Sequence, residues 1–131
     1  MSCLFNSMSH FIKEDGGGPN GIRQRICDYL EKNLPILEGM ETCDVLQLEA
    51  PSAADYISKM RKSSTWGGAI EIQCACNIWN ARIIVHDIRS HYSNNKNNKI
   101  EFLPLRAVHS TLTKLDFELE WSGGHYEPCR N

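Results

Sequence analysis

The sequence has no long hydrophobic run, no large excess of charge and no dense group of cysteines. No apolar segment approaches the roughly 18 residues that span a bilayer, and the N-terminal residues lack the basic and apolar regions of a secretory signal. The 14 Lys and Arg residues nearly balance the 16 Asp and Glu residues, so the chain has no general attraction for nucleic acid or anionic membrane. We expect a soluble, cytoplasmic protein that binds neither.

The six cysteines are scattered along the chain, which argues against a disulfide framework and favours reduced thiols. Cys74 and Cys76 are two positions apart in a helical pattern, where side chains point in different directions and cannot easily share a metal ion. We expect no metal site. A length of 131 residues suffices for one core, so we expect residues 1–131 to form a single, monomeric domain.

Apolar residues in the first part of the chain recur at three- and four-residue steps, which predicts helices. Residues 14–20 contain three glycines and a proline, which end the first helix, and residues 36–50 show no clear period. Ser52 and Asp55 form a capping box for the third helix. Four helices are expected. The first begins at Cys3 and ends before residue 14, and the others cover about 21–33, 52–62 and 69–79.

The second part of the chain has the pattern of strands. Residues 82–88 predict a buried strand, while 100–102 and 115–121 alternate as half-buried strands do. Residues 93–99, with four asparagines, predict a solvated hairpin loop, and a short last strand is expected to carry His125 and Tyr126. Because helices precede strands, the order favours an α+β fold over a doubly wound βαβ fold.

Cys3 stands at the start of the first expected helix, where free N–H groups and the positive end of the helix dipole stabilise a thiolate. The same N–H groups can donate to the oxyanion that forms when a carbonyl is attacked. Cys3 is therefore a candidate nucleophile, the alternative being a small apolar helix residue.

His125 follows a glycine pair at the end of an alternating strand, where a side chain can be held rigidly and still face a cleft. A cysteine and its general base need only be near in space, so their long separation in sequence is no objection. His125 is a candidate base, and the alternative is an ordinary surface histidine.

Five segments in the right order resemble the ovarian-tumour (OTU) family of cysteine proteases. The first is similar to the family's nucleophile segment, which reads roughly Asp-Gly-x-Cys-Leu-Phe, and the last falls where the family keeps its catalytic histidine and the aromatic residue after it. Together they extend over nearly the whole chain. The segments are residues 2–9, 22–30, 56–60, 65–72 and 125–126.

The resemblance implies an OTU-like, papain-like fold with helices packed on a small, mainly antiparallel sheet. It also implies a deubiquitinase that cleaves isopeptide or peptide bonds after the C-terminal glycine of ubiquitin or a ubiquitin-like modifier. In the implied mechanism, His125 removes the proton from Cys3, the thiolate attacks the glycine carbonyl and water hydrolyses the thioester. No organic cofactor is required, and the location would be the host-cell cytoplasm if the chain is viral.

The resemblance also implies roles around the cysteine and histidine. Glu127 occupies the position where many members keep the Asp or Asn that orients the imidazole, and its alternative is a solvent-facing strand residue. Trp121, Gly123, Gly124 and Tyr126 would shape a narrow channel for a Gly-Gly tail. Trp66 either lines the same cleft or anchors two helices in the core.

The sequence departs from the family pattern at the nucleophile, because the position of the family's aspartate would precede Met1. This departure puts the oxyanion hole in doubt and supports a second interpretation, a catalytically silent OTU-like module that binds ubiquitin or scaffolds a larger protein. A third interpretation is an unrelated α+β interaction domain in which Cys3 and His125 do not meet.

Overall fold

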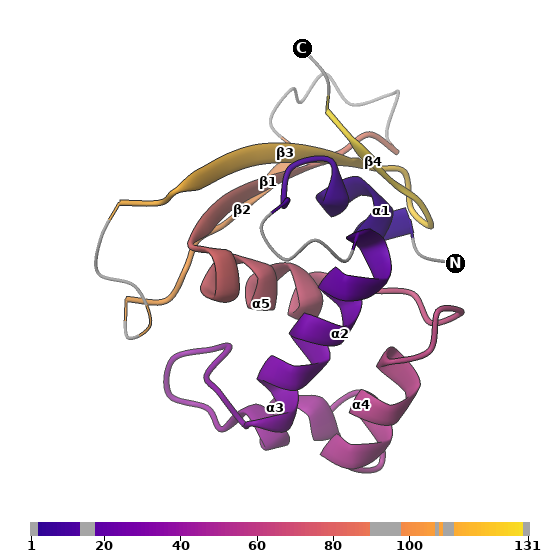
Figure 1. The fold of residues 1–131 in the computed structure, drawn as a ribbon, viewed down its shortest axis with the longest axis vertical. Coiled ribbons are helices and arrows are strands. Elements are labelled where there is room, and N and C mark those ends of the chain that lie inside the picture. Colours follow the sequence, from indigo (N-terminus) through magenta and orange to yellow (C-terminus); the bar gives the residue numbers. More distant parts are fainter. Residues whose placement is uncertain (1–2, 14–17, 90–97, 107, 109–111, 130–131) are drawn as a thin grey trace.

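The computed structural model describes residues 3–13, 18–89, 98–106, 108 and 112–129. The described strands and helices form an α+β arrangement, as the order of the sequence patterns predicted (Figure 1). The helices are α1 (Cys3–Ser9), α2 (Gly18–Glu31), α3 (Thr42–Gln47), α4 (Ala53–Met60) and α5 (Ala69–Trp79). The strands are β1 (Ala81–Asp87), β2 (Lys99–Phe102), β3 (Leu115–Trp121) and β4 (Tyr126–Pro128).

The strands form one mixed sheet in the order β2-β1-β3-β4. β1 pairs with β2, and β3 with β4, in antiparallel fashion, as expected. The central pair, β1 and β3, is parallel, which the expectation of a mainly antiparallel sheet did not include. Because parallel strands run in the same direction, β1 and β3 end at the same edge, where Asp87 and Trp121 are register partners.

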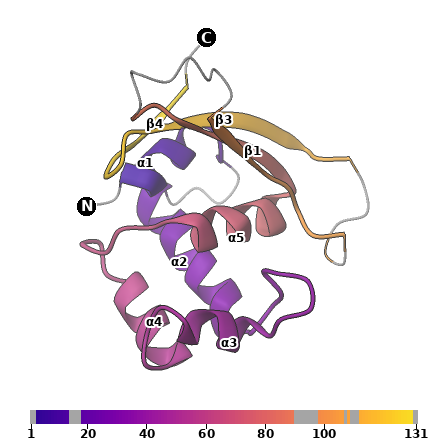
Figure 2. The ribbon, with the colours of Figure 1, turned by 180° about the vertical axis from the view of Figure 1, so that it is seen from behind.

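The helices lie on one side of the sheet (Figures 1 and 2). α1 packs against β4 and α5 packs against β1, while α2 contacts both of these helices and α4. α3 packs against α4 at the end of the molecule that is farthest from the sheet. Burial of apolar side chains between sheet and helices drives this arrangement, and the fully buried core includes Phe5, Met8, Ile26, Ile83 and Leu119.

The short helix α3 lies within residues 36–50, where the sequence shows no clear period and no helix was predicted. α3 has six residues, which is too short for an apolar spacing to repeat. Its first residue, Thr42, donates a side-chain hydrogen bond of 2.5 Å to the carbonyl oxygen of Leu34. This bond ties α3 to the segment after α2, a contact that no local pattern indicates.

The other expected elements are present, with shifted ends. Ser52 caps α4 by accepting a hydrogen bond of 3.1 Å from the N–H of Asp55, and α5 covers the expected residues. α1 ends earlier than expected, α2 begins and ends earlier, and His125 precedes β4 instead of lying within it. Ile100 is 62% exposed and not half-buried, because β2 is an edge strand. Residues 93–97 of the expected hairpin loop lie outside the described residues.

No helix within the described ranges is long and apolar enough to cross a membrane.

Candidate active site

Cys3 is the first residue of α1, and its side chain is half-buried. Two features hold the helix: Phe5 and Met8 are buried in the core, and the hydroxyl of Ser7 donates a hydrogen bond of 2.9 Å to the backbone oxygen of Tyr126. The first N–H groups of a helix have no acceptor within it, so they are available to a carbonyl oxygen next to Cys3. α1 therefore presents a thiol and hydrogen-bond donors from one fixed turn.

His125 lies on the turn between β3 and β4. The N–H of Ser122 donates a hydrogen bond of 3.0 Å to the carbonyl oxygen of His125, and Gly123 has a φ of +109°, which suits glycine. The imidazole Nε2 lies 3.1 Å from Oε1 of Glu127. The two side chains are 56% and 64% exposed, so this pair faces solvent. The contact is compatible with the expected orienting role of Glu127, which stays a prediction, and the exposure of Glu127 also agrees with the alternative of a solvent-facing strand residue.

The segment before α5 lies between α1 and this turn. A β-carbon built on Gly67 would lie 2.8 Å from Cδ2 of Leu4 and 3.0 Å from Cζ of Phe5, so the backbone there packs closely against side chains of α1. A β-carbon on Gly124 would lie 3.1 Å from Cζ3 of Trp66, so the indole rests against the histidine turn. The chain from 66 to 67 thus joins the two halves of the candidate site.

Trp66 is 51% exposed, which excludes the alternative that it is a core anchor between two helices. It lies at the surface beside the turn that carries His125, where the cleft alternative placed it. Its role toward a substrate stays a prediction.

The amino end of α1 and the β3–β4 turn lie at the same edge of the molecule in both views (Figures 1 and 2). α1 packs against β4, whose first residue, Tyr126, follows His125. Burial raises the pKa of Tyr126, and the charge of Cys3 raises it further. The ring centroids of Tyr126 and Trp121 are 6.4 Å apart. Folding therefore brings α1, which begins at Cys3, against β4 and beside the turn that carries His125, an arrangement that the protease interpretation requires; the roles of the individual side chains stay predictions.

A buried polar cluster supports the segment before α5. Glu71 is 1% exposed; its carboxylate accepts a hydrogen bond of 2.7 Å from the N–H of Gly68 and one of 2.6 Å from the hydroxyl of Tyr56. Burial raises the pKa of Glu71, while the two donors act in the opposite direction. The cluster closes the amino end of α5 and so sets where the preceding Trp66 and Gly67 lie.

Arg23 connects this cluster to α1. Its guanidinium carbon lies 4.2 Å from the centroid of the Phe5 ring, and its Nη1 donates a hydrogen bond of 2.7 Å to the carbonyl oxygen of Met60. Burial lowers the pKa of Arg23, and Glu71 acts against this shift. The sequence analysis gave no role to Arg23 or Glu71; the one local signal was the position of Glu71, which is that of a capping-box residue.

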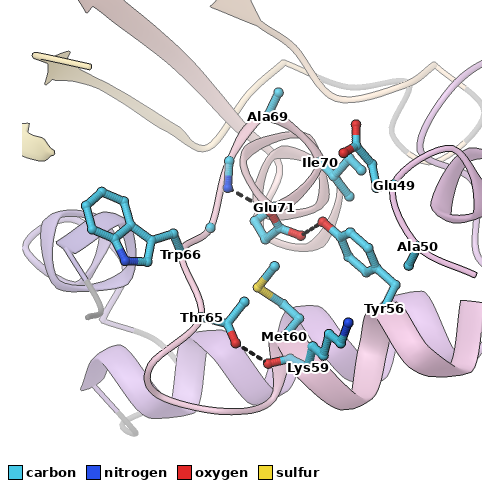
Figure 3. A pocket seen from close by; sticks show the side chains of 12 residues that line it. Glu49, Ala50, Tyr56, Lys59, Met60, Thr65, Trp66, Ala69, Ile70 and Glu71 are labelled. Atoms are coloured by element: carbon cyan, nitrogen blue, oxygen red, sulfur yellow. Dashed lines mark hydrogen bonds between the residues drawn. The ribbon is translucent and has the colours of Figure 1, made fainter. Parts of the chain in front are cut away.

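A cavity of about 410 Å³ opens beside this cluster, between α4 and the start of α5 (Figure 3). Tyr56 and Glu71, joined by their hydrogen bond, both line it, and so does Trp66, whose ring also lies against Gly124 of the histidine turn.

Within the described parts of the chain, no group of three or more His, Cys, Asp and Glu residues could hold a metal ion. The candidate site offers a thiol, an imidazole and a carboxylate, which suit nucleophilic catalysis.

Comparison with known proteins agrees with this geometry. Residues 2–126 match the family described as OTU-like cysteine protease. No curated protein sequence matches the chain.

Solved structures with the same fold include three OTU proteins. The viral OTU domain protease from Dera Ghazi Khan virus is 22% identical with a TM-score of 0.63, and the match covers 97% of this chain and 72% of that one. An OTU domain in complex with ubiquitin is 22% identical with a TM-score of 0.68, covering 97% and 62%. An OTU deubiquitinase from Wolbachia pipientis wMel bound to ubiquitin is 14% identical with a TM-score of 0.66, covering 99% and 90%.

These likenesses extend over nearly all of this chain, and they show a common fold. Because the family match also covers most of the residues, from the nucleophile segment to the residue after His125, the chain belongs to the OTU-like cysteine protease family.

Proposed function

We propose that this OTU-family chain is a deubiquitinase in which Cys3 is the nucleophile, His125 the general base and Glu127 the residue that orients the imidazole. The observation that supports it best is the convergence of α1 and the β3–β4 turn, linked by the hydrogen bond from Ser7 to the Tyr126 carbonyl and by the contact of Trp66 with Gly124. Two OTU structures with this fold contain ubiquitin, which makes ubiquitin the first substrate to test.

In this mechanism His125 takes the proton of Cys3, and the thiolate attacks the carbonyl carbon of the modifier's C-terminal glycine. The tetrahedral oxyanion accepts hydrogen bonds from N–H groups at the amino end of α1. His125 then gives its proton to the leaving amine as the C–N bond breaks, which leaves a thioester. Water, deprotonated by His125, attacks the thioester and releases the modifier and the Cys3 thiol.

A Gly-Gly tail fits the channel we propose, because its walls are formed by flat or small side chains. Trp121 and Tyr126 lie next to each other on one side, and Trp66 rests on Gly124. We therefore expect a tail with larger side chains at its last two positions to be cleaved more slowly.

The test is a ubiquitin probe with an electrophilic C-terminus, used side by side with a ubiquitin-like modifier probe. We expect the wild type to form a covalent adduct and Cys3→Ala to form none. Cys43→Ala is the control, because Cys43 is also a half-buried free thiol. It lies in α3, at the end of the molecule opposite the sheet and the candidate site. Binding of ubiquitin without an adduct would favour the silent module. The absence of both binding and adduct with every modifier probe would contradict the proposal.

A further inference from the structure

The turn that carries His125 contains two adjacent glycines, which makes it intrinsically flexible. Each glycine has a contact from outside the hairpin. Gly124 has Trp66, and a β-carbon on Gly123 would lie 3.2 Å from Cδ and 3.7 Å from Cγ of Arg89. The alkyl part of Arg89 therefore passes directly over the left-handed residue of the turn.

The side chain of Arg89 is held in place from the end of β1. Its backbone N–H and its Nε each donate a hydrogen bond of 3.0 Å to Oδ1 of Asp87, and its Nη2 lies 2.8 Å from Oδ2. This bidentate pairing fixes both the position and the plane of the guanidinium group. Asp87 is the last residue of β1, so Arg89 is fixed to a central strand of the sheet.

The guanidinium also lies on an aromatic ring of the neighbouring strand. Its carbon is 4.2 Å from the centroid of the Trp121 ring, within the range of a cation–π interaction. The N–H of Ile88 donates a hydrogen bond of 3.0 Å to the carbonyl oxygen of Trp121. Arg89 thus joins the end of β1, the end of β3 and the first glycine of the histidine turn.

We propose that Arg89 is a positioning residue for His125: by lying on Trp121 and over Gly123, it holds the β3–β4 turn so that the imidazole faces Cys3. This inference rests on the proposed function, since it assigns His125 the role of base. A displacement of a catalytic group by about 1 Å can reduce the rate roughly 100-fold. A flexible Gly-Gly turn would allow such a displacement unless side chains outside it restrain it.

A role in folding alone is the competing explanation, and the exposure of Arg89 separates the two. Its side chain is 54% exposed, and ion pairs at such positions contribute little to stability. Loss of Arg89 should therefore leave the fold intact and change mainly the placement of the turn.

The test compares Arg89→Ala with Arg82→Ala in cleavage of a ubiquitin substrate. Arg82 is the matched control, an arginine of β1 that pairs with Glu101 and Asp116 instead of Trp121. We expect Arg89→Ala to lower kcat by roughly 10- to 100-fold with little change in KM. Arg89→Lys keeps an alkyl chain and a cation over Trp121 and should recover part of the loss, whereas Arg82→Ala should retain wild-type kcat.

An equal kcat in wild type and Arg89→Ala would overturn the proposal, and so would a change in KM alone, which would make Arg89 a substrate-binding residue. A second readout needs no activity: the NMR signals of the His125 ring and of the Gly123 and Gly124 amides should shift or broaden in Arg89→Ala and not in Arg82→Ala. If the wild type forms no adduct with the ubiquitin probe, the proposed function fails, and the NMR comparison still decides whether Arg89 restrains the turn.

Discussion

The imidazole Nε2 of His125 lies 3.1 Å from a carboxylate oxygen of Glu127, two residues further along the chain. Glu127 lies in β4 and His125 just before it, and the carboxylate reaches the ring that we propose as the base. The family pattern that the chain resembles has Asp or Asn here. The longer glutamate side chain still reaches the imidazole.

We predict that Glu127→Ala lowers kcat/KM for a ubiquitin substrate by roughly 10- to 100-fold. The loss should be smaller than the ~10⁴-fold loss seen when a buried triad carboxylate is replaced, because this pair is exposed to water. Glu120→Ala is the control, since Glu120 is the register partner of Glu127 on β3. Equal losses in both variants would mean that general surface charge matters and not the contact with His125.

The buried pair of Tyr56 and Glu71 predicts a pH-dependent change in stability. Tyr56→Phe removes a donor from a carboxylate that is 1% exposed, which should cost about 1–3 kcal/mol of unfolding free energy. The hydrogen bond from Tyr56 lowers the pKa of Glu71, so its loss raises that pKa in the folded state and leaves the unfolded chain unchanged. In Tyr56→Phe, therefore, the ionised form of Glu71 loses more stabilisation than the protonated form.

The destabilisation by Tyr56→Phe should therefore be smallest at low pH and increase as the pH rises through the pKa of Glu71. Urea unfolding of wild type and variant between pH 5 and pH 9 measures it. A difference in free energy that shrinks with rising pH would contradict the assignment of Tyr56 as donor to the carboxylate.

Adjacent glycines before α5 offer a matched pair of substitutions. A β-carbon at Gly67 would lie 2.8 Å from Leu4 and 3.0 Å from Phe5, whereas one at Gly68 would meet nothing within 4 Å. Gly67→Ala must displace the buried side chains of Leu4 and Phe5, which directly follow Cys3 in α1, at a cost of about 1–3 kcal/mol. We expect slower labelling by the ubiquitin probe and a lower midpoint of urea unfolding for Gly67→Ala. Gly68→Ala should stay close to wild type in both measurements.

The six cysteines should differ in reactivity toward small alkylating reagents. Burial raises the pKa of Cys27 to about 11 and that of Cys76 to about 12, and it also raises the pKa of the buried Cys74. Because the thiolate is the reactive form, these three should resist iodoacetamide in the folded protein at pH 8. The partly exposed Cys3 should react, and peptide mass spectrometry after brief alkylation checks this. Rapid modification of Cys74 in the folded state would contradict the core packing.

Local patterns in the sequence were enough for most elements of this fold. Apolar residues on more than one face of residues 69–79 predicted a largely buried helix, and α5 has these bounds. The side chain of Ser52 caps α4 as expected, since capping involves residues three apart. α3 was missed because it is too short to repeat any spacing.

The chain by itself determined which groups could do chemistry: a cysteine at the first turn of a helix, a histidine after a glycine pair, and a carboxylate two residues later. Only the tertiary structure decided that β1 and β3 run parallel and end together, that Trp66 rests on Gly124, and that Arg89 reaches from Asp87 over Gly123. These contacts join residues that are far apart in sequence, so they depend on how whole elements pack and leave no periodic signal in the residues themselves.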